Sequence, residues 1–280
     1  MELTNSSDIA IVVFACDRYE FLYKGFLYAF REHWPNVVQK KYFVTETVDF
    51  DDSEFIHVKS GNGPWSDRLK KVLDQIDESY IILLQEDMWF LQSCSAVALQ
   101  QCISYVQDHD LSYMKLHSTG SYITEPLDVY IEGLQIAEVD KKRSRFLLAH
   151  NISIWSIDFL KSQLLPGEDP WMNERRGSVR LKKSNTKVYQ IDLFGVNGKS
   201  PINDNENLDA RGEYKTVSNN AIVTDEVINF YDLFESKDRE YAEAVQYKLE
   251  HRITHDGKVT PKAKGLKNKI KRQIKLLFDI

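Results

Sequence analysis

The sequence lacks any apolar run of about 18 residues, the length that a membrane-spanning helix needs. Its first residues, MELTNSSD, also lack the basic flank and the apolar stretch of a secretory signal. Cysteine is scarce, and Cys16, Cys94 and Cys102 have neither metal-ligand spacing nor the even number of a disulfide framework. We therefore expect a cytoplasmic protein that folds in water, with all three cysteines reduced and buried.

Basic charge is scarce in most of the chain and concentrated at its end. The net charge is -6, but residues 258–280 hold eight Lys and Arg residues against one Asp. An acidic body argues against nucleic acid as a partner, because that contact needs a basic face. In the tail, Leu266, Ile270, Ile274 and Leu277 form an apolar stripe among lysines. This pattern is typical of a basic amphipathic helix that lies on an anionic membrane, or of a terminal helix packed on the domain.

The composition is that of an ordinary globular protein, with 42% hydrophobic and 28% charged residues. A chain of 280 residues can bury one substantial core. We expect one elaborated domain over residues 1–257, followed by the basic tail 258–280.

Strand and helix patterns alternate in the first half of the chain. IAIVVFAC (9–16) is a nearly continuous apolar run, as expected of a parallel strand buried on both faces. Apolar residues then recur at helical spacing until Trp34-Pro35, and KKYFVTET (40–47) and FIHV (55–58) have strand patterns. The alternation predicts a mostly parallel α/β sheet with helices on both faces.

The pattern continues with a helix over 66–76 capped by Ser66, a strand YIILLQEDMWF (80–90), a helix over 94–107 and a strand over 113–118. From 120 to 155 the segments shorten, which indicates added antiparallel strands and a mixed sheet. The remaining expected elements are a helix over 156–165, a loop and turn over 166–174, and strands within 186–196 and 213–223.

Polarity arrives abruptly in the strand over 80–90, at Gln85, Glu86 and Asp87. In open α/β sheets, ligands bind beyond the carboxyl ends of the strands. Two adjacent carboxylates there suit Mg²⁺ or Mn²⁺, which takes oxygen ligands and bridges the phosphates of a nucleotide. The alternative is a pair of solvated acids at a strand end.

Several motifs together resemble the GT-A fold glycosyltransferases. They are the turn CDRYEFL, TE after the second strand, the loop and helix GNGPWSDRLKKVL, and IILLQEDMWF, all within about residues 8–120. A later segment, NISIWSIDFLKSQLLPGEDPWMNE (151–174), is similar to one in bacterial capsule and lipopolysaccharide glycosyltransferases. The resemblance implies a GT-A-like (Rossmann-like) fold, with a nucleotide-sugar half over about 8–120 and an acceptor half over about 121–257.

The resemblance also implies roles for individual residues on the donor side. Asp87 would bind the divalent cation and Glu86 would contact ribose or sugar, although Gln85 stands where many members of the family have an acid. The other implied nucleotide contacts are Asp17 and Arg18 near the base, Glu46 near the base or ribose, and Arg68 near the base or phosphate.

On the acceptor side, an inverting transferase needs a carboxylate that deprotonates the attacking hydroxyl. Asp169 is the first candidate for this base, and Glu168 and Glu174 are its rivals. Trp171 could stack against a sugar ring. Alternatively Trp171 fills the core and the three acids are solvated; whether the reaction inverts or retains stays open.

Histidines could complete a metal site. His117 and His150 are candidates, although a structural role is the commoner one for such residues. His251 and His255 are four residues apart, but Gly257 follows at once and no HExxH motif is present, so zinc is not expected there.

The combined patterns favour a glycosyltransferase that moves a sugar from a nucleoside diphosphate donor to a glycan, or a lipid-linked glycan, of a surface polysaccharide. It would work in the cytoplasm, with peripheral contact to the inner face of the membrane through the tail. A nucleotidyltransferase is the alternative enzyme, although no Gly-rich basic phosphate loop is visible near the first strand. A catalytically inactive, carbohydrate-binding module of the same fold is the non-enzymatic alternative.

Overall fold

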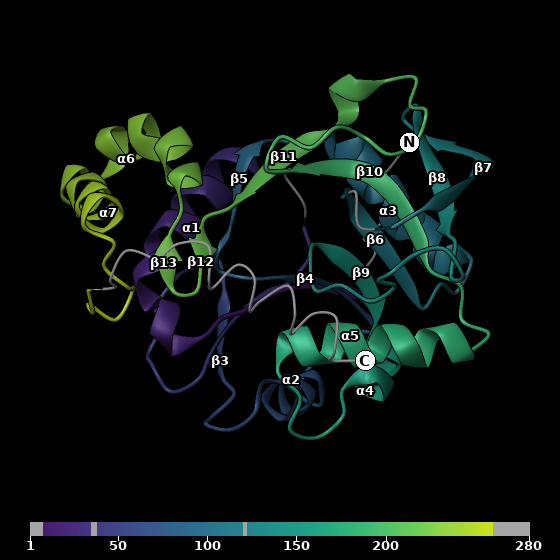
Figure 1. The fold of residues 1–280 in the computed structure, drawn as a ribbon, viewed down its shortest axis with the longest axis horizontal. Coiled ribbons are helices and arrows are strands. Elements are labelled where there is room, and N and C mark those ends of the chain that lie inside the picture. The colour runs from purple at the N-terminus through teal and green to yellow at the C-terminus, as the bar shows by residue number, and fades with distance from the viewer. Residues whose placement is uncertain (1–7, 35–37, 120–121, 260–280) are drawn as a thin grey trace, which may run out of the picture.

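The computed structural model describes residues 8–34, 38–119 and 122–259, which form a mixed α/β fold (Figure 1). An 11-stranded sheet runs through it in the order β3-β2-β1-β4-β9-β6-β10-β11-β5, with β8 paired to β10 and β7 to β8. A separate hairpin is formed by β12 and β13. The strands are β1 Ile9–Phe14, β2 Lys41–Thr45, β3 Ile56–Lys59, β4 Tyr80–Leu84, β5 Met88–Gln92, β6 Tyr113–Ser118, β7 Thr124–Ile131, β8 Leu134–Val139, β9 Ser153–Ser156, β10 Tyr189–Val196, β11 Gly212–Thr216, β12 Ser218–Asn219 and β13 Ile222–Val223.

The directions of the strands decide which chain ends meet. β1 is parallel to β2 and β4, and β6 is parallel to β10, which is parallel to β11. β9 lies antiparallel between β4 and β6. The carboxyl ends of β1, β4 and β11 and the start of β9 therefore lie at one edge of the sheet. The predicted mixed, mostly parallel, Rossmann-like sheet is confirmed.

Helices cover both faces of the sheet, as predicted. On one face, α1 and α3 contribute to the large core that also contains Ile9, Ile11 and Val13 of β1. On the other face, α2, α4 and α5 contribute to a second core that also contains Ala10 and Val12 of β1 and Trp155 of β9. The helices are α1 Glu20–His33, α2 Trp65–Leu73, α3 Ala96–Asp108, α4 Ile157–Gln163, α5 Pro170–Lys183, α6 Tyr231–Lys237 and α7 Arg239–His251, with 3-10 turns at Asp17–Tyr19, Leu208–Ala210 and Asp225–Phe230.

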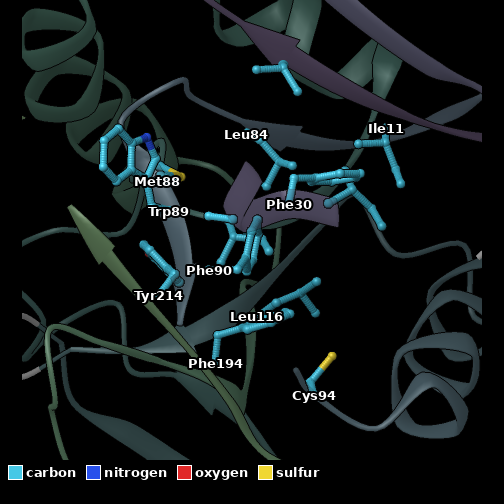
Figure 2. Close-up of a cluster of buried hydrophobic side chains, with 14 of the residues drawn as sticks. Ile11, Phe30, Leu84, Met88, Trp89, Phe90, Cys94, Leu116, Phe194 and Tyr214 are labelled. Carbon is cyan, nitrogen blue, oxygen red and sulfur yellow. The ribbon is translucent and has the colours of Figure 1, made fainter. Parts of the chain in front are cut away.

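The prediction of one strand over 80–90 is wrong, because the chain turns at the acidic residues. β4 ends at Leu84, and β5 starts at Met88 and pairs antiparallel with β11. Figure 2 shows Met88, Trp89 and Phe90 of β5 among the buried side chains of the large core, close to Phe194 and Tyr214. This apolar anchor holds the turn Gln85–Asp87 between two buried strands.

The predicted loop over 166–174 is also wrong in its second half, where α5 begins at Pro170. Asp169 is the N-cap, and its Oδ1 accepts a hydrogen bond from the backbone N–H of Met172 at 2.6 Å. Pro170 occupies the first helical position, where the missing N–H costs nothing. The Asp-Pro pair is thus a helix start.

Two smaller predictions also need correction, and two helices were not predicted. Ser66 is not a cap but lies inside α2, where its Oγ accepts a hydrogen bond from the N–H of Glu168 at 3.0 Å. Cys94 and Cys102 are buried as expected, whereas Cys16 is only half-buried. The helices α6 and α7 are not predicted by the sequence patterns.

The expected amphipathic helix in the tail falls mostly within 260–280, outside the described residues. Within the described parts of the chain, no helix has the length and apolar character to cross a membrane.

Candidate active site

A cavity of about 480 Å³ opens at the carboxyl edge of the sheet. Its walls come from the ends of β1, β4 and β11, the segment before β9, the hairpin β12–β13, and the starts of α2 and α5. It is lined by Phe14, Ala15, Cys16, Tyr19, Trp65, Arg68, Gln85, Glu86, Asp87, Met88, His150, Asn151, Pro170, Trp171, Glu174, Thr216, Ser218, Asn219 and Asn220.

Glu86 and Asp87 form the acidic floor of this cavity. Burial and the neighbouring Asp87 raise the pKa of Glu86 well above its ordinary value, against the backbone hydrogen bonds and Arg68, which lower it. Burial raises the pKa of Asp87 to about 6. Two adjacent carboxylates that are hard to ionise favour a cation beside them. The backbone fixes the turn, since the carbonyl of Asp87 accepts the N–H of Val217 at 2.9 Å.

Arg68 is the cation that faces these acids from α2. Its guanidinium lies 5.0 Å from the ring centre of Phe14, and it is only 5% exposed. One nitrogen donates to Ser60 Oγ at 3.0 Å, and another lies 3.2 Å from Glu46 Oε1. Its Nε has no partner among the described residues. The guanidinium is thus held rigidly at the cavity wall with one donor unused.

Asp17 lies behind the cavity and connects the ends of β1 and β2. Its carboxylate accepts hydrogen bonds from the backbone N–H groups of Glu46, Thr47 and Val48 at 2.7 to 3.0 Å. These bonds outweigh burial and lower its pKa. In return, Glu46 Oε2 accepts the N–H of Asp17 at 3.0 Å. Asp17 therefore positions Glu46, and through it Arg68, and is not itself in the lining.

Arg18, another predicted donor-side residue, is not in the cavity lining. It is exposed and lies 3.8 Å from Asp256, and both line a second, shallower hollow with Asp17 and His255. The structure thus brings Arg68, Glu86 and Asp87 together in the cavity, with Glu46 and Asp17 directly behind Arg68.

On the acceptor side, Glu174 of α5 faces the cavity. Its Oε1 accepts a hydrogen bond from the backbone N–H of His150 at 2.8 Å, and burial raises its pKa against that bond. Two tryptophans flank it in the lining, Trp65 against the ring of His150 and Trp171 at the mouth, where it is 67% exposed. Trp171 is therefore available as a platform and does not fill the core.

The two other predicted bases lie outside the lining. Asp169 caps α5, as described above. Glu168 is 1% exposed and accepts hydrogen bonds from Asn173 at 2.7 Å and from Arg180 at 3.1 Å. These bonds outweigh its burial and lower its pKa. Glu168 thus fastens the start of α5 and is committed to Arg180 and Asn173.

The histidines are structural or remote from the acids. His117 is fully buried, its Nδ1 bonds the carbonyl of Ile152 at 3.0 Å, and burial lowers its pKa to about 3. His150 lines the cavity, but its Nε2 bonds Asn173 at 2.9 Å and burial lowers its pKa to about 4. His255 bonds Ser218 Oγ at 2.8 Å and is not on α7, which ends at His251.

The described residues hold no group of three or more His, Cys, Asp or Glu that could bind a metal ion. Glu86 and Asp87 are the adjacent pair of carboxylates at the cavity, whereas Glu174, the third carboxylate in its lining, comes from α5. This set fits Mg²⁺ or Mn²⁺ bound together with a diphosphate, because Mg²⁺ is usually held by one or two carboxylates plus substrate phosphates. It does not fit a cation caged by protein alone.

Sequence reasoning missed the wall that β11 and the hairpin β12–β13 supply. Thr216, Ser218, Asn219 and Asn220 reach the cavity from there. The hairpin turn has positive φ at Asn220 (53°) and Ala221 (60°), and asparagine is a residue that favours this conformation. The Asn219-Asn220 pair could have predicted a hairpin turn, but nothing in the sequence placed that turn beside Glu86.

The fold and the cavity together define a Rossmann-like α/β protein with an acidic turn at the end of a central parallel strand, and this topology is consistent with the GT-A class. No family model matches the sequence, and no curated protein matches it significantly.

Among solved structures, S. aureus TarS 1–349 in complex with UDP-GlcNAc is similar over 88% of this chain and 72% of that one, with a TM-score of 0.48 and 11% identity. S. aureus TarS gives a TM-score of 0.46 at 11% identity, and this chain spans only 43% of that one. UDP-glucose pyrophosphorylase complexed with UDP-glucose gives 0.41 at 13% identity, over 66% of this chain and 91% of that one. Similarities this low carry no argument about function.

Proposed function

We propose that the protein is a glycosyltransferase that moves a sugar from a nucleoside diphosphate donor to a hydroxyl of a glycan acceptor. The observation that supports this most is one cavity that joins the acidic turn Glu86-Asp87, the guanidinium of Arg68 and the carboxylate of Glu174. Transfer from a nucleotide sugar needs such a combination: groups that neutralise the charge of the diphosphate, and a base that deprotonates the acceptor hydroxyl.

The donor would lie over the turn after β4. A divalent cation held by Asp87, with Glu86 beside it, would neutralise the charge of the departing diphosphate. Arg68 lines the cavity and would bind the base or a phosphate. Its contact with Glu46, which Asp17 orients, fixes the direction of the guanidinium before any ligand arrives.

Glu174 takes the role of general base in this proposal, in place of Asp169. A base must reach the hydroxyl that it deprotonates. Glu174 lines the cavity, whereas Asp169 lies outside the lining and its Oδ1 accepts the N-cap hydrogen bond of α5. A raised pKa makes a carboxylate a stronger base when it is ionised. The bond from the N–H of His150 holds Oε1 in place and leaves the other oxygen for a substrate.

The acceptor would be a glycan, or a lipid-linked glycan, of a surface polysaccharide, with Trp171 as the stacking platform at the mouth. Membrane contact through the tail remains part of the proposal. Deletion of residues 262–280 tests it by vesicle sedimentation, where unchanged binding to anionic vesicles would exclude the tail as the anchor.

The reaction type is tested by asking which phosphate bond the protein breaks. Wild-type protein is incubated with sugar nucleotides and Mn²⁺, and release of nucleoside diphosphate is followed. In parallel it is incubated with nucleoside triphosphates and sugar phosphates, and release of pyrophosphate is followed. We expect nucleoside diphosphate from the first mixture and no pyrophosphate from the second.

Pyrophosphate release would replace our proposal by a nucleotidyltransferase. Nucleotide binding with no product in either mixture would favour an inactive carbohydrate-binding module. Asp87→Asn is the control, because genuine turnover must disappear in that variant.

A further inference from the structure

The outer face of α5 carries an exposed row of side chains that leads away from the cavity. Trp171, Arg175, Val179 and Lys182 are all exposed, and their spacing of four, four and three residues puts them on one side of the helix. We call these four residues the α5 ridge. With Lys183 beside Lys182, the row is basic along most of its length.

The basic groups of the ridge form no close ion pair, although Arg175 acts on the neighbouring Glu174 and opposes the rise in its pKa. Within the described residues, neither Arg175 nor Lys182 lies within ion-pair distance of an acid. Two neighbouring arginines differ, since Arg180, which is partly buried, and Arg176, which is exposed, lie 3.1 and 3.9 Å from Glu168. Lys182 and Lys183 lie in the last turn of α5, where cations also stabilise the helix dipole, whereas Arg175 lies too far from that end to do so. Exposed cations without partners are available to an external anion.

The ridge is continuous with the cavity at one end and with a basic loop at the other. Trp171 lines the cavity mouth. At the far end, Lys141 Nζ donates to the carbonyl of Ser184 at 2.8 Å, which joins the loop after β8 to the end of α5. That loop adds the exposed Lys142 and Arg145. Figure 1 shows α5 running from beside α2 toward the side of the sheet that holds β7 and β8.

From Trp171 to Lys182 the helix rises about 16 Å, a length that several linked sugars span. We propose that the α5 ridge binds an anionic glycan acceptor, a polymer with carboxylate or phosphate groups whose reacting end enters the cavity past Trp171. An indole at the mouth suits a sugar ring, and cations along the helix suit its charges. This inference rests on the proposed glycosyltransferase function and narrows its acceptor class.

An extended chain fits this row better than a membrane does. The ridge is a single line of side chains that begins inside a cavity mouth, and a threaded polymer can contact all of its members at once. A bilayer surface would need a broad apolar face to insert, whereas the ridge offers only Trp171 and Val179. The test below therefore includes anionic vesicles, which represent the alternative that the α5 ridge binds a membrane surface.

The test compares two double charge reversals in the full chain. Arg175→Glu with Lys182→Glu removes the ridge cations. The control, Lys237→Glu with Arg239→Glu, makes the same change in net charge on α6 and α7, far from α5 in Figure 1. All four side chains are exposed, so both variants should fold, which melting curves check.

The probes are oligogalacturonate, which carries one carboxylate per sugar, the neutral maltooligosaccharide, and vesicles of phosphatidylglycerol with phosphatidylcholine. We expect wild type to bind oligogalacturonate more tightly than maltooligosaccharide, and less tightly as salt rises. The ridge variant should lose about tenfold or more in affinity for oligogalacturonate, as two charge-assisted contacts are lost. The control variant should bind like wild type.

The proposal is overturned if wild type does not prefer the anionic glycan, if both variants lose affinity equally, or if the ridge cations matter only for vesicles. A nucleoside diphosphate melting shift on the same wild-type preparation separates the two hypotheses. If nucleoside diphosphate raises the melting temperature but the protein does not prefer the anionic glycan, only the proposal about the α5 ridge is wrong. If the protein prefers the anionic glycan but no nucleotide raises the melting temperature, the proposed donor is wrong and the α5 ridge proposal stands.

Discussion

Two buried acidic regions of this protein differ in how their charges are satisfied. Asp192 in β10 is fully buried, and its carboxylate accepts hydrogen bonds from Gln190, Ile202, Asn203 and Asn205 at 2.8 to 3.0 Å. Glu86 after β4 is almost as buried, at 6% exposed, yet burial and Asp87 together raise its pKa. Burial of a carboxylate therefore does not by itself indicate a functional site. A buried carboxylate that receives too few hydrogen bonds does indicate one.

The same contrast recurs within one helix start. Glu168 and Glu174 are six residues apart, but Glu168 is held by Arg180 and Asn173 while Glu174 receives one backbone bond. Burial is the largest influence on the pKa of both, yet that pKa is lowered in Glu168 and raised in Glu174. The satisfied acids hold loops and helices in place, and the unsatisfied ones line the cavity. The predictions below test this division.

Asp87→Asn should give the largest effect. It removes the proposed cation ligand, and we expect nucleoside diphosphate release to fall by about 10²- to 10³-fold, the range for loss of one key electrostatic contact. A phosphate-release assay measures the loss. A variant that keeps more than about a third of the wild-type rate would contradict the role of Asp87.

The same variant should be more stable than wild type at pH 8. The pKa of Asp87 in the folded state, about 6, lies above the ordinary 3.8, so its ionisation weakens the fold as pH rises from about 4 to 6. Removing that cost should raise the free energy of unfolding by up to about 3 kcal/mol at pH 8 and leave it unchanged at pH 3. Urea unfolding at both pH values measures the difference.

Asp192→Ala should act on stability. It strands the backbone N–H groups of Ile202 and Asn203, which are bonded to the carboxylate at 3.0 and 2.9 Å. We expect a loss of about 3 kcal/mol in the free energy of unfolding, because a buried N–H group without an acceptor has lost its hydrogen bond to water and gained none in return. Urea unfolding at pH 7 measures it, and an unchanged midpoint would show that this network is dispensable.

Glu174→Gln should slow transfer by about 10²-fold through loss of the base, while nucleotide binding stays close to that of wild type. Because burial raises the pKa of Glu174, the wild-type rate should increase with pH through a value above 4.5, and this acid limb should be absent in the variant. Initial rates from pH 4 to 8 provide the test. A variant with the same acid limb would show that another group titrates.

Asp169→Ala should have the smallest effect, a loss of about 1 kcal/mol in stability from the missing cap. We expect the transfer rate to fall by less than about fivefold, the factor that corresponds to that free energy. Melting curves and initial rates check both values. A loss as large as that of Glu174→Gln would restore Asp169 as the base.

The local patterns predicted the parallel strands and the acidic strand end, because buried strands require apolar runs and the end of burial is visible as polarity at Gln85. They did not predict β5, since its partner β11 lies more than 100 residues away in the sequence. α5 could have been predicted from Asp169-Pro170, a cap followed by a first-turn proline. The partners that distinguish Glu168 from Glu174 depend on packing, which one sequence does not encode locally.

The central claim is that the turn Glu86-Asp87 binds a nucleoside diphosphate through a divalent cation. The most direct measurement is a melting-temperature screen of nucleoside diphosphates and sugar nucleotides, with and without Mn²⁺, on wild type and Asp87→Asn. Ligand at about 100 times its Kd stabilises by roughly 2.7 kcal/mol, a rise of several degrees in Tm. We predict that rise for wild type with Mn²⁺ and no Mn²⁺-dependent part in Asp87→Asn. An unchanged Tm with every nucleotide would contradict the account.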